Sequence, residues 1–284
     1  MDNKIIIGSA QFGTKYSLNN KKVLKSDECE KIFRKCKINK IKFLDTAFDY
    51  LEANKILKKL GCKDFNVITK IPKMNFKSTS YHENKIFNLL NDYNIKQFYA
   101  ILLHDEKFIF TKDGEKMFNF LKYLKKNNVT KKIGVSVYNF SVLKKIVKNF
   151  DIDIVQCPIN VFDREFIEKS NINDLKKKKI EIHARSIFLQ GLLLLKSKQI
   201  PRKFKKYDRY FVEWENYLEE NKISNYLNCI NFIKKQLQID KVIVGVDNVN
   251  HLDEFIKNWK KKVFFNDDFN LEIKDKNLLK PYLW

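Results

Sequence analysis

The sequence predicts a single-domain α/β fold, a closed (β/α)8 TIM barrel that spans residues 1–284. Short runs rich in Ile, Val and Phe alternate with longer segments of helical periodicity along the whole chain, which is typical of repeated βα units on a parallel sheet. A length of 284 residues suits one such barrel. No stretch rich in Pro, Gly or Ser divides the chain, so we expect one domain.

Eight apolar runs have the length and composition of buried strands. They cover residues 4–9, 41–45, 65–70, 97–103, 132–136, 152–156, 180–184 and 242–244. Eight amphipathic segments between and after these runs are long enough to be helices. They cover residues 27–39, 51–60, 81–92, 113–127, 141–150, 165–178, 221–236 and 249–260. Matching sets of strands and helices in strict alternation favour a closed barrel.

The only long irregular insert, residues 192–220, follows the seventh expected strand. Loops after barrel strands lie over the C-terminal face, where barrel enzymes keep their chemistry, so we expect this insert to form a cap. Its segment 196–209 is dense in Lys and Arg. We expect that segment to help recruit an anionic ligand by raising the rate of encounter.

The composition limits the classes of protein that remain. A hydrophobic fraction of 44% supports a packed interior, and no run of roughly 18 apolar residues suggests a membrane span. A net charge of +22 raises nucleic acid as a partner, but the lysines are spread through nearly every segment, which argues against a dedicated binding patch. Five cysteines without a C-x-x-C pair indicate neither a disulfide framework nor a zinc site. We therefore expect a cytoplasmic protein without a metal; nothing indicates its oligomeric state.

Four polar residues stand at or just after the ends of neighbouring expected strands: Asp45, Tyr50, Lys70 and His104. Each alone has an ordinary structural explanation, such as a helix cap, a packed ring, a lysine reaching water or a core imidazole. In a barrel, however, the carboxyl ends of these strands converge on one small volume. A buried Lys there requires a carboxylate, and a Tyr beside an ammonium acquires a lower pKa.

The sequence around these residues resembles the aldo-keto reductase superfamily. The resemblance rests on the strings Phe43-Leu-Asp-Thr-Ala-Phe-Asp-Tyr50, Val67-Ile-Thr-Lys70 and Leu102-Leu-His-Asp105. It extends through residues 133–139, 155–160, 186–193 and 242–247, in the right order and over nearly the whole chain. The opening segment Gly8-Ser-Ala-Gln-Phe-Gly13 is similar to that of a group of bacterial members.

The resemblance implies reduction of a small-molecule aldehyde or ketone to an alcohol by hydride from NADPH. Tyr50 would be the proton donor, Lys70 paired with Asp45 would lower its pKa, and His104 would polarise the carbonyl. The usual Gly-rich dinucleotide motif is missing, so the cofactor would be held differently. The implied cofactor contacts are Ser136, Gln156, Arg185, Ser186, Phe188, Gln190, Gly245, Asp247, His251 and Glu254.

Several positions depart from the family pattern. Val137 replaces a common Asn, Arg185 replaces a Tyr that stacks on the nicotinamide, and Leu51 replaces a Gly after the catalytic Tyr. Asp247 and His251 stand where an Arg or Lys would grip the 2'-phosphate, which leaves NADH open as the cofactor.

The resemblance to the bacterial group suggests a sugar or sugar nucleotide as the substrate. Two alternatives remain: a catalytically silent barrel that binds a nucleotide as a sensor or scaffold, and a basic nucleic-acid-binding protein. The second would need the exposed aromatics Phe204, Tyr207 and Tyr210 within the basic segment.

Overall fold

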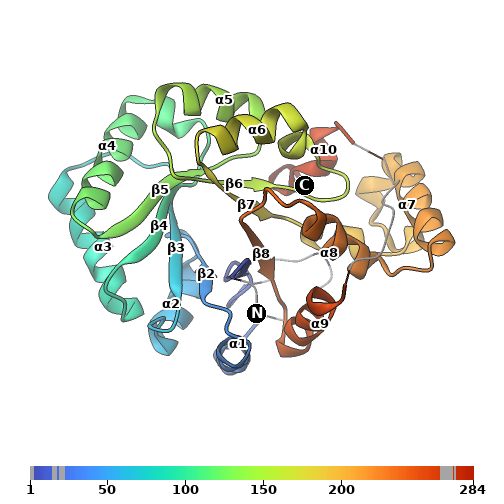
Figure 1. Cartoon of the computed structure of the whole chain (residues 1–284). Coiled ribbons are helices and arrows are strands. Elements are labelled where there is room, and N and C mark those ends of the chain that lie inside the picture. Colours follow the sequence, from blue (N-terminus) through green and yellow to red (C-terminus); the bar gives the residue numbers. More distant parts are fainter. Residues whose placement is uncertain (1–2, 15–17, 19–22, 263–270, 272) are drawn as a thin grey trace.

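Eight parallel strands form a closed barrel in the computed structural model, which describes residues 3–14, 18, 23–262, 271 and 273–284 (Figure 1). The strands are β1 (Ile5–Gly8), β2 (Phe43–Asp45), β3 (Asn66–Ile71), β4 (Phe98–Leu103), β5 (Thr130–Ser136), β6 (Ile154–Pro158), β7 (Glu181–Arg185) and β8 (Lys241–Gly245). They pair in sequence order, and β8 closes on β1 with Gly245 opposite Gly8. The predicted (β/α)8 barrel is confirmed.

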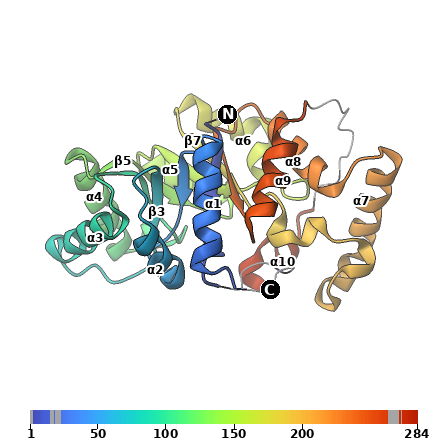
Figure 2. The ribbon, with the colours of Figure 1, turned by 90° about the horizontal axis from the view of Figure 1, so that it is seen from below.

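Helices surround the barrel on the outside (Figures 1 and 2). They are α1 (Ser26–Ile38), α2 (Leu51–Leu60), α3 (Thr79–Tyr93), α4 (Lys112–Lys126), α5 (Phe140–Asn149), α6 (Lys169–Lys177), α7 (Asp208–Glu220), α8 (Asn225–Lys235), α9 (Val249–Lys260) and α10 (Lys276–Leu279). Hydroxyl and amide side chains cap several starts; Thr111 Oγ1 accepts from Gly114 N at 3.1 Å before α4. The main apolar core lies between this ring of helices and the strands.

Two expected helices are shorter than predicted. The segment 165–178 is broken at Glu168, whose backbone is extended at ψ 135°, so that a 3-10 turn at Glu165–Ile167 precedes α6. The turn buries Phe166 against Phe140, with the ring centroids 5.8 Å apart. The segment 221–236 becomes helical only at Asn225, because Ser224 caps α8 by accepting from Leu227 N at 3.2 Å.

The insert 192–220 is more regular than predicted. A 3-10 turn at Leu189–Leu194 leads into it, and it contains two further 3-10 turns, at Ser197–Gln199 and Arg202–Tyr207, and then helix α7. Phe211, Trp214 and Leu218 recur at helical spacing and bury one face of α7. In both views α7 lies at the periphery, beyond α8 and α9 (Figures 1 and 2).

Two aromatic side chains of the basic segment point inward. Phe204 is 2% exposed and packs on Trp284 with the centroids 4.7 Å apart. Tyr207 is 5% exposed, and its hydroxyl donates to Asp275 Oδ2 at 2.7 Å. These rings anchor the C-terminal residues, and so they do not form the exposed stacking surface that binding to single-stranded nucleic acid would require.

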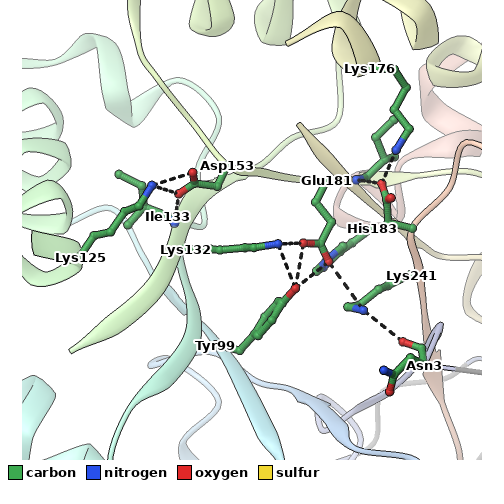
Figure 3. Close-up of polar contacts among 12 residues, drawn as sticks. Asn3, Tyr99, Lys125, Lys132, Ile133, Asp153, Lys176, Glu181, His183 and Lys241 are labelled. Atoms are coloured by element: carbon green, nitrogen blue, oxygen red, sulfur yellow. Dashed lines mark hydrogen bonds and ion pairs between the residues drawn. The ribbon is translucent and has the colours of Figure 1, made fainter. Parts of the chain in front are cut away.

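The barrel interior has an apolar layer between two polar ones. The apolar layer consists of Ile6, Phe43, Ile68, Ala100, Leu102 and Ile154. Beneath it lies a basal polar layer, which we define as Tyr99, Lys132, Glu181, His183 and Lys241 (Figure 3). Asp45 and Lys70 lie two residues beyond Phe43 and Ile68 of the apolar layer, toward the carboxyl ends of β2 and β3.

Glu181 is the centre of the basal polar layer. Its carboxylate accepts from Tyr99 Oη at 2.8 Å, pairs with Lys132, and lies 2.8 Å from His183 Nε2 and 3.7 Å from Lys241 Nζ (Figure 3). Burial alone would raise the pKa of Glu181, but hydrogen bonds and charges from His183 and Lys132 outweigh it and hold the pKa far below its usual range. One carboxylate thus offsets several cations at the base of the barrel.

All five cysteines are buried free thiols. Within the described ranges, no three His, Cys, Asp or Glu side chains gather in a way that could hold a metal ion. No helix in this part of the chain combines the length and the apolar character that crossing a membrane requires.

Candidate active site

The four residues at the strand ends meet at the carboxyl end of the barrel. Asp45 is the last residue of β2, Lys70 lies in β3, Tyr50 directly precedes α2 and His104 directly follows β4. Lys70 Nζ lies 2.5 Å from Asp45 Oδ2 and donates to the Thr46 carbonyl at 2.8 Å. The side chains of this ion pair are 2% and 7% exposed, so Lys70 is a buried cation with its partner in place.

Tyr50 and His104 lie beside this ion pair. Lys70 Nζ is 5.7 Å from the centroid of the Tyr50 ring. The rings of Tyr50 and His104 meet edge to face, with centroids 6.0 Å apart and an interplanar angle of 74°. All four predicted side chains line one cavity of about 680 Å³, which is in the range of small-molecule sites.

Burial and neighbouring charges act in opposite directions on the amine of Lys70. Burial lowers the pKa of Lys70, and the charge of Arg185 lowers it further, whereas Asp45 raises it through its charge and hydrogen bond. The pKa of Lys70 therefore lies below its usual value. An ammonium of lowered pKa beside a phenol exchanges a proton with it more readily than a free lysine would.

Asp49 is a member of the site that the sequence analysis missed. Its Oδ1 lies 3.4 Å from His104 Nδ1. Burial alone would raise the pKa of Asp49, but the hydrogen bond and charge of His104 outweigh it and lower the pKa. Asp49 can therefore fix the ring orientation of His104 and leave Nε2 to face a ligand. Its position directly before Tyr50 was the signal available in the sequence.

Ser136 and Gln156 lie opposite each other on β5 and β6, and both are buried in the cavity wall. Gln156 Nε2 donates to Asp45 Oδ1 at 2.8 Å. Each oxygen of Asp45 thus has its own donor, Gln156 for one and Lys70 for the other. Contacts from two sides of the barrel hold this carboxylate in place.

Arg185 and Val137, which both depart from the family pattern, are in direct contact. The guanidinium of Arg185, at the end of β7, lies 3.9 Å from the centroid of the Tyr138 ring. Arg185 Nη2 also donates to the Val137 carbonyl at 3.0 Å. A planar cation packed on an aromatic face is restrained in orientation, so Arg185 presents a fixed positive charge to the cavity.

The loop after β7 forms one wall of the cavity with an unusual backbone. Ser186, Leu189 and Gln190 have left-handed φ values of 58°, 47° and 52°, and Gly191 follows at 88°. Each such non-glycine residue costs about 1–3 kcal/mol, and this strain is typical of ligand-binding loops. The Ser186 and Gln190 carbonyls accept from Asn160 Nδ2 and Leu18 N, at 3.1 and 3.2 Å. Phe188 stacks on Tyr226 with the centroids 4.8 Å apart.

The far end of the cavity is built by β8 and the start of α9. Gly245 lies under the side chain of Gln11, and a Cβ at this glycine would be 2.0 Å from Gln11 Oε1. Gln11 Nε2 donates to Asp247 Oδ1 at 2.9 Å. His251 Nδ1 lies 3.7 Å from Asp247 Oδ2, and Glu254 also lines this end. The sequence analysis missed Gln11 as a site residue, although it belongs to the opening segment Gly8 to Gly13.

The structure brings every predicted site residue to this single cavity. The lining contains the catalytic candidates, the predicted cofactor contacts from Ser136 to Gln190 and those from Gly245 to Glu254. Of the insert 192–220, only Leu194 contributes to the lining. Additional lining residues beside the catalytic group, which the sequence analysis missed, are Asp105, Glu106, Lys107, Tyr138 and Tyr282.

The sequence profile of the Aldo/keto reductase family matches residues 4–277, which is nearly the whole chain. The chain belongs to this family. It is therefore an oxidoreductase of the aldo/keto reductase type. A comparison with curated protein sequences gives no match.

Solved structures of other aldo-keto reductases share the barrel. A holo-form aldo-keto reductase from Bacillus halodurans is 15% identical, with a TM-score of 0.70 over 92% of this chain and 88% of that chain. The glycerol dehydrogenase from Gluconobacter oxydans is 14% identical, with a TM-score of 0.66 over 93% and 88%. At these identities the likeness supports the fold alone, so the roles of individual residues depend on the geometry of the site.

Proposed function

We propose that this aldo/keto reductase reduces an aldehyde or ketone to an alcohol with a reduced nicotinamide dinucleotide, and that Tyr50 is the general acid. The observation that carries the proposal is the buried pair of Lys70 and Asp45, at 2.5 Å, beside Tyr50 and His104 in the wall of one cavity. Burying a cation next to a phenol costs desolvation free energy. Such a cation is useful in acid catalysis, because it favours loss of the phenolic proton to a carbonyl oxygen.

The protein's own side chains donate the proton and stabilise the charges that form. The cofactor, when bound, supplies a hydride to the carbonyl carbon. Tyr50 donates its phenolic proton to the carbonyl oxygen, so that the alcohol forms without a free alkoxide. Lys70 stabilises the resulting phenolate by its charge, and Asp45 keeps that lysine positioned. His104, oriented by Asp49, donates a hydrogen bond to the same oxygen.

We place a dinucleotide in this cavity. Ser136 and Gln156 offer a hydroxyl and an amide beside the catalytic group, where a carboxamide would lie. The strained loop that contains Ser186, Phe188 and Gln190 offers backbone amides for a pyrophosphate. Residues 245–254 would then hold the adenosine. A cavity of about 680 Å³, lined without a Gly-rich motif, supports this placement.

We propose a sugar or sugar nucleotide as the substrate, as the resemblance of the opening segment to the bacterial group suggests. The substrate end of the cavity has suitable chemistry: Tyr138 and Tyr282 pack at 4.6 Å, and Asp105 and Lys107 add polar groups. Aromatic faces pack against sugar rings, and charged side chains bind hydroxyl groups. We also place the enzyme in the cytoplasm, because five buried free thiols suit a reducing compartment.

A substrate screen tests the proposal. Purified protein is incubated with NADH or NADPH and with panels of aldehydes, ketones, free sugars and sugar nucleotides, and the near-ultraviolet absorbance of the reduced cofactor is followed. Reduction of at least one carbonyl class, absent in Tyr50→Phe, is the expected result. No oxidation of either cofactor with any carbonyl would contradict the proposed reaction.

A further inference from the structure

We infer that Asp247 makes this enzyme select NADH over NADPH, an inference that depends on the proposed use of a nicotinamide dinucleotide. With the nicotinamide beside Tyr50 and Lys70, the proposed placement puts the adenosine at the end of the cavity that β8 and the start of α9 build. That end is formed by Gly245, Asp247, His251 and Glu254. Asp247 therefore lies where the ribose that carries the 2'-group has to be recognised.

Asp247 is a restrained carboxylate and cannot readily turn away. Its side chain is only 13% exposed. Gln11 Nε2 donates to Oδ1 at 2.9 Å, from the loop after β1, and His251 Nδ1 lies 3.7 Å from Oδ2, from α9. The Gln11 side chain is itself only 8% exposed and covers Gly245. Two separate segments thus fix the negative charge at the wall of the cavity.

A fixed carboxylate interacts differently with NADH and with NADPH. The ribose 2'-hydroxyl of NADH can donate a hydrogen bond to a carboxylate, which is how an acidic residue recognises NAD in other dinucleotide sites. The 2'-phosphate of NADPH carries about 1.5 to 2 negative charges at neutral pH and offers mainly acceptors. It would be repelled by Asp247 and, more weakly, by Glu254 on the same wall.

The start of α9 offers little compensation for a phosphate. Helix N-termini bind phosphate through their free amides. Here Val249 N donates to Glu28 Oε1 at 2.8 Å, and His251 N donates to Asn248 Oδ1 at 2.9 Å. Two of the amides that could face an anion are therefore occupied, one of them by a further carboxylate.

The Lys and Arg side chains of the described cavity lining do not lie among the residues proposed to hold the adenosine. Among the described lining residues of the cavity, the Lys and Arg side chains are Lys70 in β3, Lys107 after β4 and Arg185 at the end of β7, so none comes from β8 or α9. At the adenosine end the only basic side chain of that lining is His251, which faces Asp247.

Binding of cofactor fragments tests the inference without any turnover. Calorimetric titrations at pH 8 use ADP-ribose and its 2'-phosphate, which share the adenosine end and lack the nicotinamide. ADP-ribose should bind at least about tenfold more tightly, a difference of about 1.4 kcal/mol. NADH and NADPH should show the same order. Equal binding, or tighter binding of the 2'-phosphates, would overturn the inference and leave the proposed reduction standing.

Variants assign the selectivity to Asp247. Asp247→Asn keeps the size of the side chain and removes its charge. It should bring the ratio of NADH affinity to NADPH affinity close to one, mainly because NADPH binds more tightly. Asp253→Asn is the matched control, because Asp253 lies nearby in α9 but pairs with Lys35 at 2.7 Å on the surface, outside the cavity lining. In Asp253→Asn the ratio of NADH affinity to NADPH affinity should equal that of the wild type. An unchanged ratio in Asp247→Asn would refute the role of Asp247, whereas no binding of either cofactor would refute the proposed function itself.

Discussion

Replacing Lys70 by Met should destabilise the fold, because it leaves the buried Asp45 carboxylate without its cation. The pair is 2.5 Å apart, with side chains 2% and 7% exposed, and only Gln156 would remain as a donor to Asp45. Removing one partner of a buried ion pair costs about 3–5 kcal/mol. For a chain of this length that corresponds to a fall in Tm of about 5–10 °C.

A double variant separates stability from chemistry. In Lys70→Met combined with Asp45→Asn, the carboxylate is neutral, so most of the lost Tm should return in thermal melts followed by circular dichroism. Turnover should stay at least about 100-fold below wild type, because the charge that stabilises the Tyr50 phenolate is gone. A single variant as stable as wild type, or a double variant no more stable than the single, would refute the account of this pair.

Further predictions concern other buried charges. Glu181→Gln leaves Lys132 and Lys241 without their counter-charge at the base, and should cost about 3 kcal/mol of unfolding free energy at pH 7. Because the folded pKa of Glu181 is depressed, this cost should shrink as pH falls below about 4. Burial, and then the charge of Glu165, raise the pKa of Asp163 to about 7. Wild-type stability should therefore fall as pH rises from about 4 to 7, and Asp163→Asn should be the more stable protein at pH 8 but not at pH 4, as chemical denaturation would show.

The sequence was sufficient to predict the residues at the strand ends. Parallel strands converge at their carboxyl ends, so Asp45, Lys70 and His104 could be placed together from the order of the strands alone. The contact of Gln156 with Asp45, across 111 positions of sequence, could not be predicted, because it depends on side-chain reach across the barrel. The same holds for Gln11 and Asp247, which meet only because β8 closes on β1.

Other differences between the predicted and the observed elements arose because local sequence signals were overlooked or absent. The periodicity of Phe211, Trp214 and Leu218 indicates α7, a signal that was overlooked when the insert was expected to be irregular. The break at Glu168 has no Pro or Gly to mark it, and the burial of Phe166 causes it through tertiary packing. The basal polar layer was also missed, because its contacts join side chains of β4, β5, β7 and β8 across the barrel.

The central claim is that Tyr50 donates the proton that completes carbonyl reduction. It is tested most directly by single-turnover reduction of the best substrate by the pre-bound cofactor, in wild type and Tyr50→Phe. The variant keeps the ring and loses only the hydroxyl, so cofactor affinity should stay within about twofold, less than 1 kcal/mol. The rate of hydride transfer should fall by at least about 100-fold. An unchanged rate in Tyr50→Phe, with substrate and cofactor both bound, would contradict the account.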